Sequence, residues 1–331
     1  MKAWIGIDVS KDSLDVWLIK EDEKSSYKQF KNESAGWSRM LRWLSSTNAD
    51  DLHFCMESTG AHSTGLALFL AERGLRVSVE NPARVKHFGI AKNMLNKTDK
   101  SDSKTIAMYC QSFSPNPWRM SAPEVRQLAA FMRRYDDLQG LLNQEKNRFA
   151  EPGLIKEVHR SLKQSVRFLE KQIEQLLDEI RRHIDRHPDL KEDQELLETI
   201  PGVGEITALW LLAELPDVSQ FSTAQDAAVF AGLNPRENKS GTSLRGKTRL
   251  SKAGNRFLRK ALYMPAMVAM RYNPLVKAMY VRLLERGLSK KSAIVACMRK
   301  LLMIAYGVLK NRCAFCTEHA STFGLEYRIA A

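Results

Sequence analysis

The stretch Trp4-Ile5-Gly6-Ile7-Asp8-Val9 decides the fold, because it is a short β-rich run that carries a carboxylate at its end. An alternating run over residues 14–18 and a more polar run over residues 25–30 follow it as two further strand candidates. The connector at residues 21–24 is short enough for a hairpin. We therefore expect three consecutive antiparallel strands at the start of the chain.

The residues that follow alternate between helix and strand patterns. Helices are expected over 35–44, over 64–73 and from residue 83 onwards, and strands over 52–56 and 75–79. Three hairpin strands followed by alternating helices and parallel strands are the order of an α/β ribonuclease-H-like fold. The sequence therefore predicts an N-terminal domain of that class over residues 1–120.

Residues 121–194 change to a helical pattern. Beyond a break at Pro152-Gly153, apolar residues recur every three or four positions over about four heptads and are flanked by charged residues. This heptad-like seam fits either an intramolecular helical hairpin or a dimerising coiled coil. The register of the seam does not by itself decide between the two.

Residues 195–312 are expected to be mainly helical, with a loop over residues 234–247. This part opens with Ile200-Pro201-Gly202-Val203-Gly204, which resembles the turn of a helix-hairpin-helix. In such a turn, glycine lets backbone N–H groups approach a phosphate at the start of a helix. Gly202 and Gly204 are therefore candidate nucleic-acid contacts, although a tight turn without a ligand has the same pattern.

The charge of the chain is concentrated near its C-terminus. The 331 residues hold 51 Lys and Arg against 38 Asp and Glu, a net charge of +13, and residues 201–331 alone contribute +12. Such asymmetry favours a polyanionic partner over an evenly solvated surface. No apolar run approaches the roughly 18 residues that span a bilayer, and five scattered cysteines make no disulfide framework. We therefore expect a cytoplasmic protein.

Four carboxylates are the candidate catalytic and metal-binding residues. Asp8 and Glu57 end the first and fourth expected strands, and Asp99 and Asp102 share one face of a helix. Together they would repel one another unless divalent cations were bound, and Mg²⁺, or Mn²⁺, prefers oxygen ligands. Two such ions about 4 Å apart can hold the attacking and leaving oxygens of a phosphodiester.

Ser240 is the candidate nucleophile, because it lies beside Gly241 in the expected loop and precedes a run of basic residues. A serine beside a glycine is also a common turn residue, but this basic run would hold a phosphate backbone against the loop. The basic residues are Arg245, Lys247, Arg249, Lys252, Arg256, Arg259 and Lys260. Near the C-terminus, Cys313, Cys316 and His319 have the spacing of half a zinc site, but no second Cys/His pair lies nearby.

The motifs of the chain resemble those of the DEDD transposases of the insertion-sequence one-ten family, the bridge-RNA-guided recombinases. In the N-terminal half they are G-I-D-V-S-K at 6–11, E-S-T-G at 57–60, N-P-A at 81–83 and K-T-D-K-S-D at 97–102. In the C-terminal half they are I-P-G-V-G-E at 200–205, F-A-G-L-N-P-R at 230–236, S-G-T-S-L-R-G at 240–246 and S-K-A-G-N at 251–255. One departure is Ser103, where the family commonly has alanine after the second aspartate.

The resemblance implies a specific organisation and chemistry. It implies a RuvC-like domain over residues 1–120, a helical coiled-coil segment over 121–194, a transposase domain over 195–312 and a tail over 313–331. The family's metal carboxylates fall on Asp8, Glu57, Asp99 and Asp102, and its catalytic serine falls on Ser240. The serine would form a covalent phosphoserine with DNA, and a structured guide RNA would pair with target and donor duplexes. The coiled coil implies a homo-oligomer, a dimer or a tetramer.

Two other functions fit the same residues. One is a RuvC-type junction-resolving nuclease, in which metal ions activate water and Ser240 is only structural. The other is a nucleic-acid-binding scaffold whose carboxylates no longer bind metal. The intact set of four carboxylates argues against the scaffold, and a covalent protein–DNA adduct would separate the recombinase from the nuclease.

Overall fold

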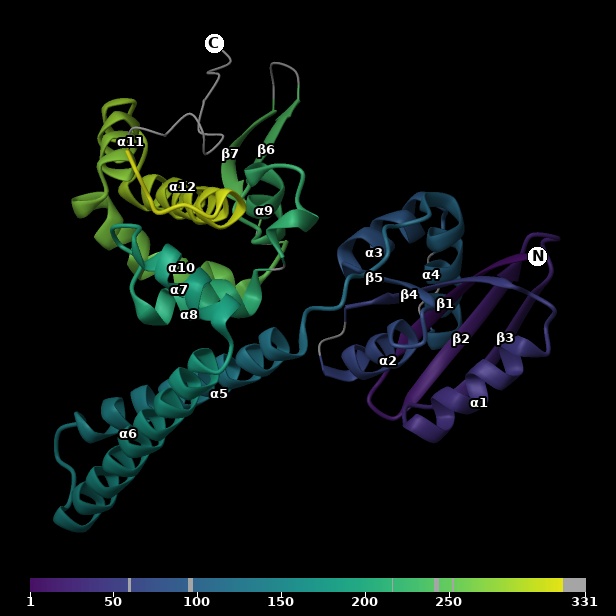
Figure 1. Ribbon diagram of the computed structural model, residues 1–331, viewed down its shortest axis with the longest axis horizontal. Coiled ribbons are helices and arrows are strands. Elements are labelled where there is room, and N and C mark those ends of the chain that lie inside the picture. Colours follow the sequence, from purple (N-terminus) through teal and green to yellow (C-terminus); the bar gives the residue numbers. More distant parts are fainter. Residues whose placement is uncertain (59–60, 95–97, 216, 241–243, 252, 318–331) are drawn as a thin grey trace. The chain divides into compact units, whose positions relative to one another are not determined.

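The computed structural model describes the chain except for residues 59–60, 95–97, 216, 241–243, 252 and 318–331, and except for the side chains of residues 61 and 236–249. The described chain forms two compact units, Met1–Met120 and Ser121–Ala331 (Figure 1). The first unit holds a mixed sheet, and the second is mostly helical.

The first unit contains five strands that form one sheet. Its elements are β1 (Lys2–Val9), β2 (Ser13–Lys20), β3 (Ser25–Lys31), α1 (Ser34–Ser45), β4 (Asp51–Glu57), α2 (Ala61–Ala71), β5 (Arg76–Glu80), α3 (Pro82–Ala91) and α4 (Asp99–Phe113). The strand order is β3-β2-β1-β4-β5. β1, β2 and β3 pair antiparallel, whereas β1, β4 and β5 pair parallel. The predicted order of a ribonuclease-H-like sheet is confirmed.

Period-two alternation separates the two faces of this sheet. Ile5 and Ile7 of β1 are fully buried in a core that α1 and α2 complete. Gly6 and Asp8 alternate with them and face the opposite side, where α4 packs across β1, β2 and β4. The end of β1 and the start of α4 therefore lie on the same face of the sheet.

The second unit begins with a long helical hairpin and continues into a helical bundle. Its elements are α5 (Pro123–Phe149), α6 (Lys156–Asp185), α7 (Pro188–Glu198), α8 (Glu205–Glu214), a 3₁₀ turn (Val218–Gln220), α9 (Ala224–Phe230), β6 (Pro235–Ser240), β7 (Leu244–Leu250), α10 (Arg256–Tyr272), α11 (Pro274–Glu285) and α12 (Lys290–Asn311).

The apolar seam of α6 packs against α5 of the same chain (Figure 1). Leu138 and Leu142 of α5 are buried with Ile173 of α6. Lys146 pairs with Glu170 across the hairpin at 2.8 Å. The structure therefore accounts for the seam by an intramolecular hairpin, and a dimerising coiled coil stays a prediction.

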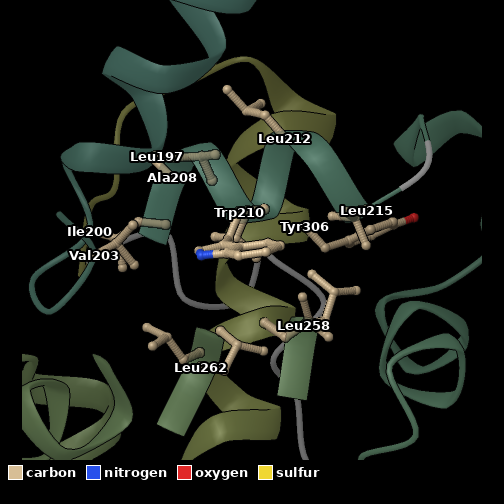
Figure 2. Close-up of a cluster of buried hydrophobic side chains, with 14 of the residues drawn as sticks. Leu197, Ile200, Val203, Ala208, Trp210, Leu212, Leu215, Leu258, Leu262 and Tyr306 are labelled. Atoms are coloured by element: carbon tan, nitrogen blue, oxygen red, sulfur yellow. The ribbon is translucent and has the colours of Figure 1, made fainter. Parts of the chain in front are cut away.

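The bundle packs around α12, most of whose side chains are buried. Figure 2 shows Trp210 of α8 and Tyr306 of α12 in this core, with Leu258 and Leu262 of α10. Within the described chain, α12 is long and apolar enough to cross a membrane, and 67% of its most apolar window is buried in the core. Arg299 and Lys300 interrupt the apolar residues of this helix, and a mostly buried core helix passes the same test of length and composition.

The expected loop at residues 234–247 is instead largely a β-hairpin. β6 and β7 pair antiparallel, from Pro235 opposite Leu250 to Ser240 opposite Leu244. The sequence hides this hairpin because its residues are mostly polar and charged, without the apolar alternation that marks a half-buried strand.

Candidate active site

Carboxylates form a row across the sheet at the C-terminal end of β1. Asp8 of β1 is paired with Asp15 of the neighbouring strand β2. The parallel register of β1 and β4, continued one residue past its last pair, sets Glu57 beside Asp8. Glu57 is in turn paired with Glu80 of β5. Because paired residues point to the same face, all four lie on the face that α4 covers.

Asp99 and Asp102 reach this row from the first turn of α4. Thr98 caps the helix: its Oγ1 accepts a hydrogen bond from the Ser101 N–H at 3.1 Å, and the Thr98 N–H donates to Ser101 Oγ at 2.9 Å. Burial, followed by the negative charges of Asp102, Asp99 and Asp15, raises the pKa of Asp8 to about 6. The structure thus brings Asp8, Asp99 and Asp102 within electrostatic reach of one another.

Gly6 lets α4 approach the sheet this closely. A Cβ atom built on Gly6 would lie 2.2 Å from the backbone N of Ala107 and 2.2 Å from the backbone O of Ser103. Ser103 follows Asp102 directly, and its buried hydroxyl donates to the Lys100 carbonyl at 3.0 Å. The serine that departs from the family pattern therefore bonds within its own helix.

The two outer carboxylates of the row have hydrogen-bond donors of their own. The Tyr27 hydroxyl donates to Asp15, and Gln29 Nε2 lies 3.2 Å from Asp15 Oδ2. This hydrogen bond and burial raise the pKa of Tyr27 to about 12, so the hydroxyl remains a donor. Glu80 accepts from Arg84 at 3.3 Å and from the Tyr109 hydroxyl at 3.4 Å.

Sequence reasoning missed Asp15 and Glu80. The signals were available, because Asp15 alternates with the apolar side chains of Leu14 and Val16 in β2, and Glu80 is the last residue of β5. Asp15 and Glu80 accept hydrogen bonds from neighbouring side chains, whereas the interactions of Asp8 with the neighbouring carboxylates are repulsive.

The donor chemistry of this row fits a divalent cation. Carboxylate oxygens are the ligands that Mg²⁺ prefers, and burial together with the neighbouring carboxylates raises the pKa of Asp8. Among the described residues, no three Asp, Glu, His or Cys side chains gather closely enough to hold one ion. Binding would therefore have to draw the α4 carboxylates and the ends of β1 and β4 together.

Ser240 is the last residue of β6, and its side chain is outside the described part of the chain. The hairpin register sets Lys239 opposite Arg245 and Arg236 opposite Arg249. Like charges at directly opposed positions destabilise a hairpin unless an anion neutralises them. The side chains of Arg245, Lys247 and Arg249, and all of Lys252, also lie outside the described residues.

Close backbone contacts fix the base of this hairpin. A Cβ atom on Gly254 would lie 2.4 Å from Gly232 N, and both glycines have positive φ. Arg259 donates to the Ala231 carbonyl at 2.9 Å, and burial lowers the pKa of its guanidinium. This geometry gives Arg259, predicted as a nucleic-acid contact, an intramolecular role.

A buried glutamate joins the hairpin base to α5. Asn255 caps α10 and donates from Nδ2 to Glu214 at 2.7 Å. Glu214, whose side chain is 4% exposed, also accepts from Arg133 Nε of α5 at 3.0 Å. Sequence patterns do not reveal this network, because Arg133, Glu214 and Asn255 lie on elements far apart in the chain.

The remaining predicted basic contacts of α10 also have neighbours in the second unit. Lys260 forms an ion pair with Asp136 of α5. The Arg256 guanidinium lies 4.7 Å from the centroid of the Phe257 ring. Both side chains are exposed, and their contact with nucleic acid stays a prediction.

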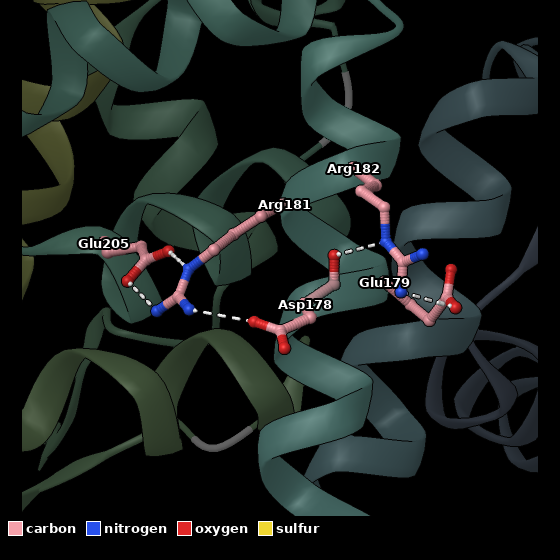
Figure 3. Close-up of polar contacts among 5 residues, drawn as sticks. All are labelled: Asp178, Glu179, Arg181, Arg182 and Glu205. Carbon is pink, nitrogen blue, oxygen red and sulfur yellow. Dashed lines mark hydrogen bonds and ion pairs between the residues drawn. The ribbon is translucent and has the colours of Figure 1, made fainter.

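The two glycines of the predicted helix-hairpin-helix turn have different surroundings. Gly202 has a φ of +103° and packs against Ala269, whereas the space around Gly204 is open. Gly204 begins α8 without a side-chain cap. Figure 3 shows Arg181 of α6 holding Glu205 through bonds of 2.7 and 3.0 Å. Gly204 is thus the more accessible of the two predicted phosphate contacts.

The cysteine pair near the C-terminus has no further support. Cys313 is exposed and Cys316 half-buried, and His319 lies outside the described residues.

Comparison with known proteins assigns both parts of the chain to one family. Residues 5–152 match the IS110 DEDD family described as "Transposase", and residues 194–281 match the family described as "Transposase IS116/IS110/IS902 family". A "Pilin gene-inverting protein" of Moraxella lacunata is 31% identical over 318 residues, which cover 95% of this chain and 98% of that protein. The chain belongs to the IS110 family of transposases.

Other relatives of this IS110-family chain match over shorter stretches. The "Transposase for insertion sequence element IS1111A" of Coxiella burnetii is 32% identical over 126 residues, covering 37% of this chain and 34% of that protein. An "Insertion element IS110 uncharacterized 43.6 kDa protein" of Streptomyces coelicolor is 29% identical over 193 residues, which cover 58% of this chain and 45% of that protein. The family is one of DNA-cleaving and strand-transferring enzymes that typically depend on divalent metal ions.

Proposed function

We propose that this transposase is an RNA-guided DNA recombinase in which Ser240 is the nucleophile and Asp8, Glu57, Asp99 and Asp102 hold Mg²⁺. The observation that carries the metal site is geometric: the register sets Glu57 beside Asp8, and the first turn of α4, which bears Asp99 and Asp102, packs over the same face of the sheet. Carboxylates held together at a cost in repulsion are typical of a site built for a cation.

The proposed chemistry is an exchange of phosphate esters. The Ser240 hydroxyl loses its proton and attacks a backbone phosphorus, a serine–phosphate bond forms, and the bond to one deoxyribose oxygen breaks. That oxygen takes up a proton, and reversal by a different strand end restores a phosphodiester. Mg²⁺ at the carboxylates would stabilise negative charge on the reacting oxygens. The basic positions of β6 and β7 would hold the flanking phosphates.

Two features support a nucleic-acid complex larger than one duplex. The opposed cationic positions in the β6–β7 register and the +12 charge of residues 201–331 favour extensive phosphate contact. A guide RNA would then choose the DNA by base pairing, so that the protein need read little sequence itself. Exposed Val158 and Phe168 of α6 offer apolar surface for a homo-oligomer.

A denaturing gel of end-labelled target DNA tests the proposal. Wild-type protein with RNA and Mg²⁺ should give a protein-linked DNA band, and Ser240→Ala should lose it while still binding RNA. Thr242→Ala and Ser243→Ala are matched controls that remove neighbouring hydroxyls and should keep the band. A band formed by Ser240→Ala would assign another nucleophile. Cleavage by wild type without any band would favour the nuclease that uses activated water.

Site-specific inversion is a second candidate function. It is favoured by the end-to-end similarity to the Moraxella lacunata pilin gene-inverting protein, whereas the IS1111A transposase matches over 34% of its length. A plasmid carrying two candidate sites in inverted orientation, scored by PCR across both junctions, would show inversion. Insertion into a second plasmid without inversion would favour transposition.

A further inference from the structure

A basic groove lies at the outer edge of the N-terminal sheet, between the edge strand β3 and helix α1. It has a volume of about 710 Å³. Four cations and two aromatic rings contribute to its lining, and no carboxylate does. These six residues are Lys28, Phe30 and Lys31 of β3, and Arg39, Arg42 and Trp43 of α1.

The aromatic rings form the floor of the groove, and the cations lie around it. The Phe30 and Trp43 ring centroids are 5.7 Å apart at an interplanar angle of 47°. Lys28 Nζ lies 5.7 Å from the Phe30 ring centroid. Phe30 is buried and Trp43 half-buried, whereas the cationic side chains are exposed.

The stability of the fold does not explain this arrangement. Arg39 and Arg42 are three residues apart on α1, a spacing at which like charges repel. Arg39 forms an ion pair with Glu33 at 3.4 Å, and both side chains are 53% exposed. Such exposed pairs contribute about 0–1 kcal/mol.

Other structural roles account for only part of the set. Lysines on an edge strand protect it against pairing with the edge of another sheet, and this role is enough to explain Lys28 and Lys31. Arg42 in the last turn of α1 complements the helix dipole. Neither role explains why Arg39 and Arg42 join the two lysines around one aromatic floor. An anionic ligand would relieve the repulsion among all four.

We propose that this groove binds the sugar–phosphate backbone of a nucleic-acid strand. Phosphates would contact the four cations, and the half-buried Trp43 ring would offer a sugar or base an apolar surface. A polynucleotide fits best because the chain belongs to a family that acts on DNA and because the cations are spread over two elements along an open edge. The groove lies on the N-terminal unit, whereas the contacts predicted from sequence lie in residues 201–331.

Lysine acetylation read by mass spectrometry tests the groove in the full-length protein. The probes are a 30-nucleotide single-stranded DNA, the matching duplex and an RNA stem-loop of equal length. A saturating polymer should slow acetylation of Lys28 and Lys31 severalfold. Lys86 of α3 and Lys92, which directly follows α3, are exposed on the same unit; they should acetylate at an unchanged rate and serve as controls. The polymer that protects best identifies which strand occupies the groove.

Paired variants give a second measurement. Arg39→Gln/Arg42→Gln should reduce the slope of log Kd against log salt by about 1.4 to 1.8, since each lost phosphate contact contributes about 0.7 to 0.9. Lys86→Gln/Lys92→Gln makes the same change in net charge and should leave the slope unchanged. Equal melting temperatures would show that both double variants fold.

Three results would overturn the proposal: equal slopes for the two double variants, protection of Lys28 and Lys31 by inorganic pyrophosphate but by none of the polymers, or protection by high protein concentration alone. The last would identify the groove as a contact between copies of the chain. Asp8→Ala should retain the protection, so failure of the metal site and failure of the groove are distinguishable.

Discussion

Replacing Gly6 with alanine tests whether the contact between β1 and α4 sets the geometry of the carboxylates. The new Cβ would lie 2.2 Å from two backbone atoms of α4, whereas ordinary contacts are 3.4–4 Å. The helix must therefore retreat by about 1.2 Å, and Asp102, adjacent to the contacted Ser103, must move with it. Overpacking of this kind costs about 1–3 kcal/mol of folding stability. A misplacement of about 1 Å at a catalytic group can lower a rate about 10²-fold.

The assay is the single-turnover rate of DNA strand cleavage in Mg²⁺, measured well below the melting temperature of each variant. Gly6→Ala should cleave about 10²-fold more slowly than wild type. The control is Leu44→Ala, which removes a fully buried side chain of α1 on the other face of the sheet and should cost about 2–5 kcal/mol. Because Leu44 does not contact α4 in that core, its loss should leave the cleavage rate of folded protein nearly unchanged.

Two outcomes would refute this reasoning. A folded Gly6→Ala protein that cleaves at the wild-type rate would show that α4 does not position the reacting groups. Equal slowing by Leu44→Ala would show that lost stability, and not displaced carboxylates, lowers the rate.

Three further predictions follow from single contacts. Mg²⁺ should raise the melting temperature of wild type but not of Asp8→Ala in differential scanning fluorimetry, and an equal rise in both would place the ion elsewhere. Burial and the nearby Arg282 lower the pKa of Lys300 to about 8, below its unfolded value of 10.5. The folded state thus binds fewer protons than the unfolded state between these values, so stability should rise as pH increases from about 8 to 10.5. Lys300→Met should flatten that rise in urea titrations, and an unchanged rise would assign it to another group. Asn255→Ala should lower the free energy of unfolding by about 1–3 kcal/mol, since it removes the α10 cap and a donor to buried Glu214; Asn255→Ser, which keeps a cap, should recover part of the loss.

The sequence by itself determined the order of the N-terminal elements. Alternating apolar residues in β1 and β2 can bury one face of a strand only in an extended conformation, so local pattern and tertiary structure agree there. It also placed Asp8 and Glu57 at the ends of neighbouring strands, because that fold makes the first and fourth strands adjacent.

Only the tertiary structure decided which other groups share that face. Asp15 and Glu80 enter the row through strand register, and Gly6 matters because α4 crosses it, which are relations between residues far apart in the chain. The β6–β7 hairpin escaped prediction because charged strands without a buried face carry no apolar alternation. The basic groove also escaped prediction, because its lysines and arginines lie on separate elements and meet only when α1 packs beside β3. Sequence pattern reports what each segment buries, whereas the gathering of charges is fixed by how the segments pack.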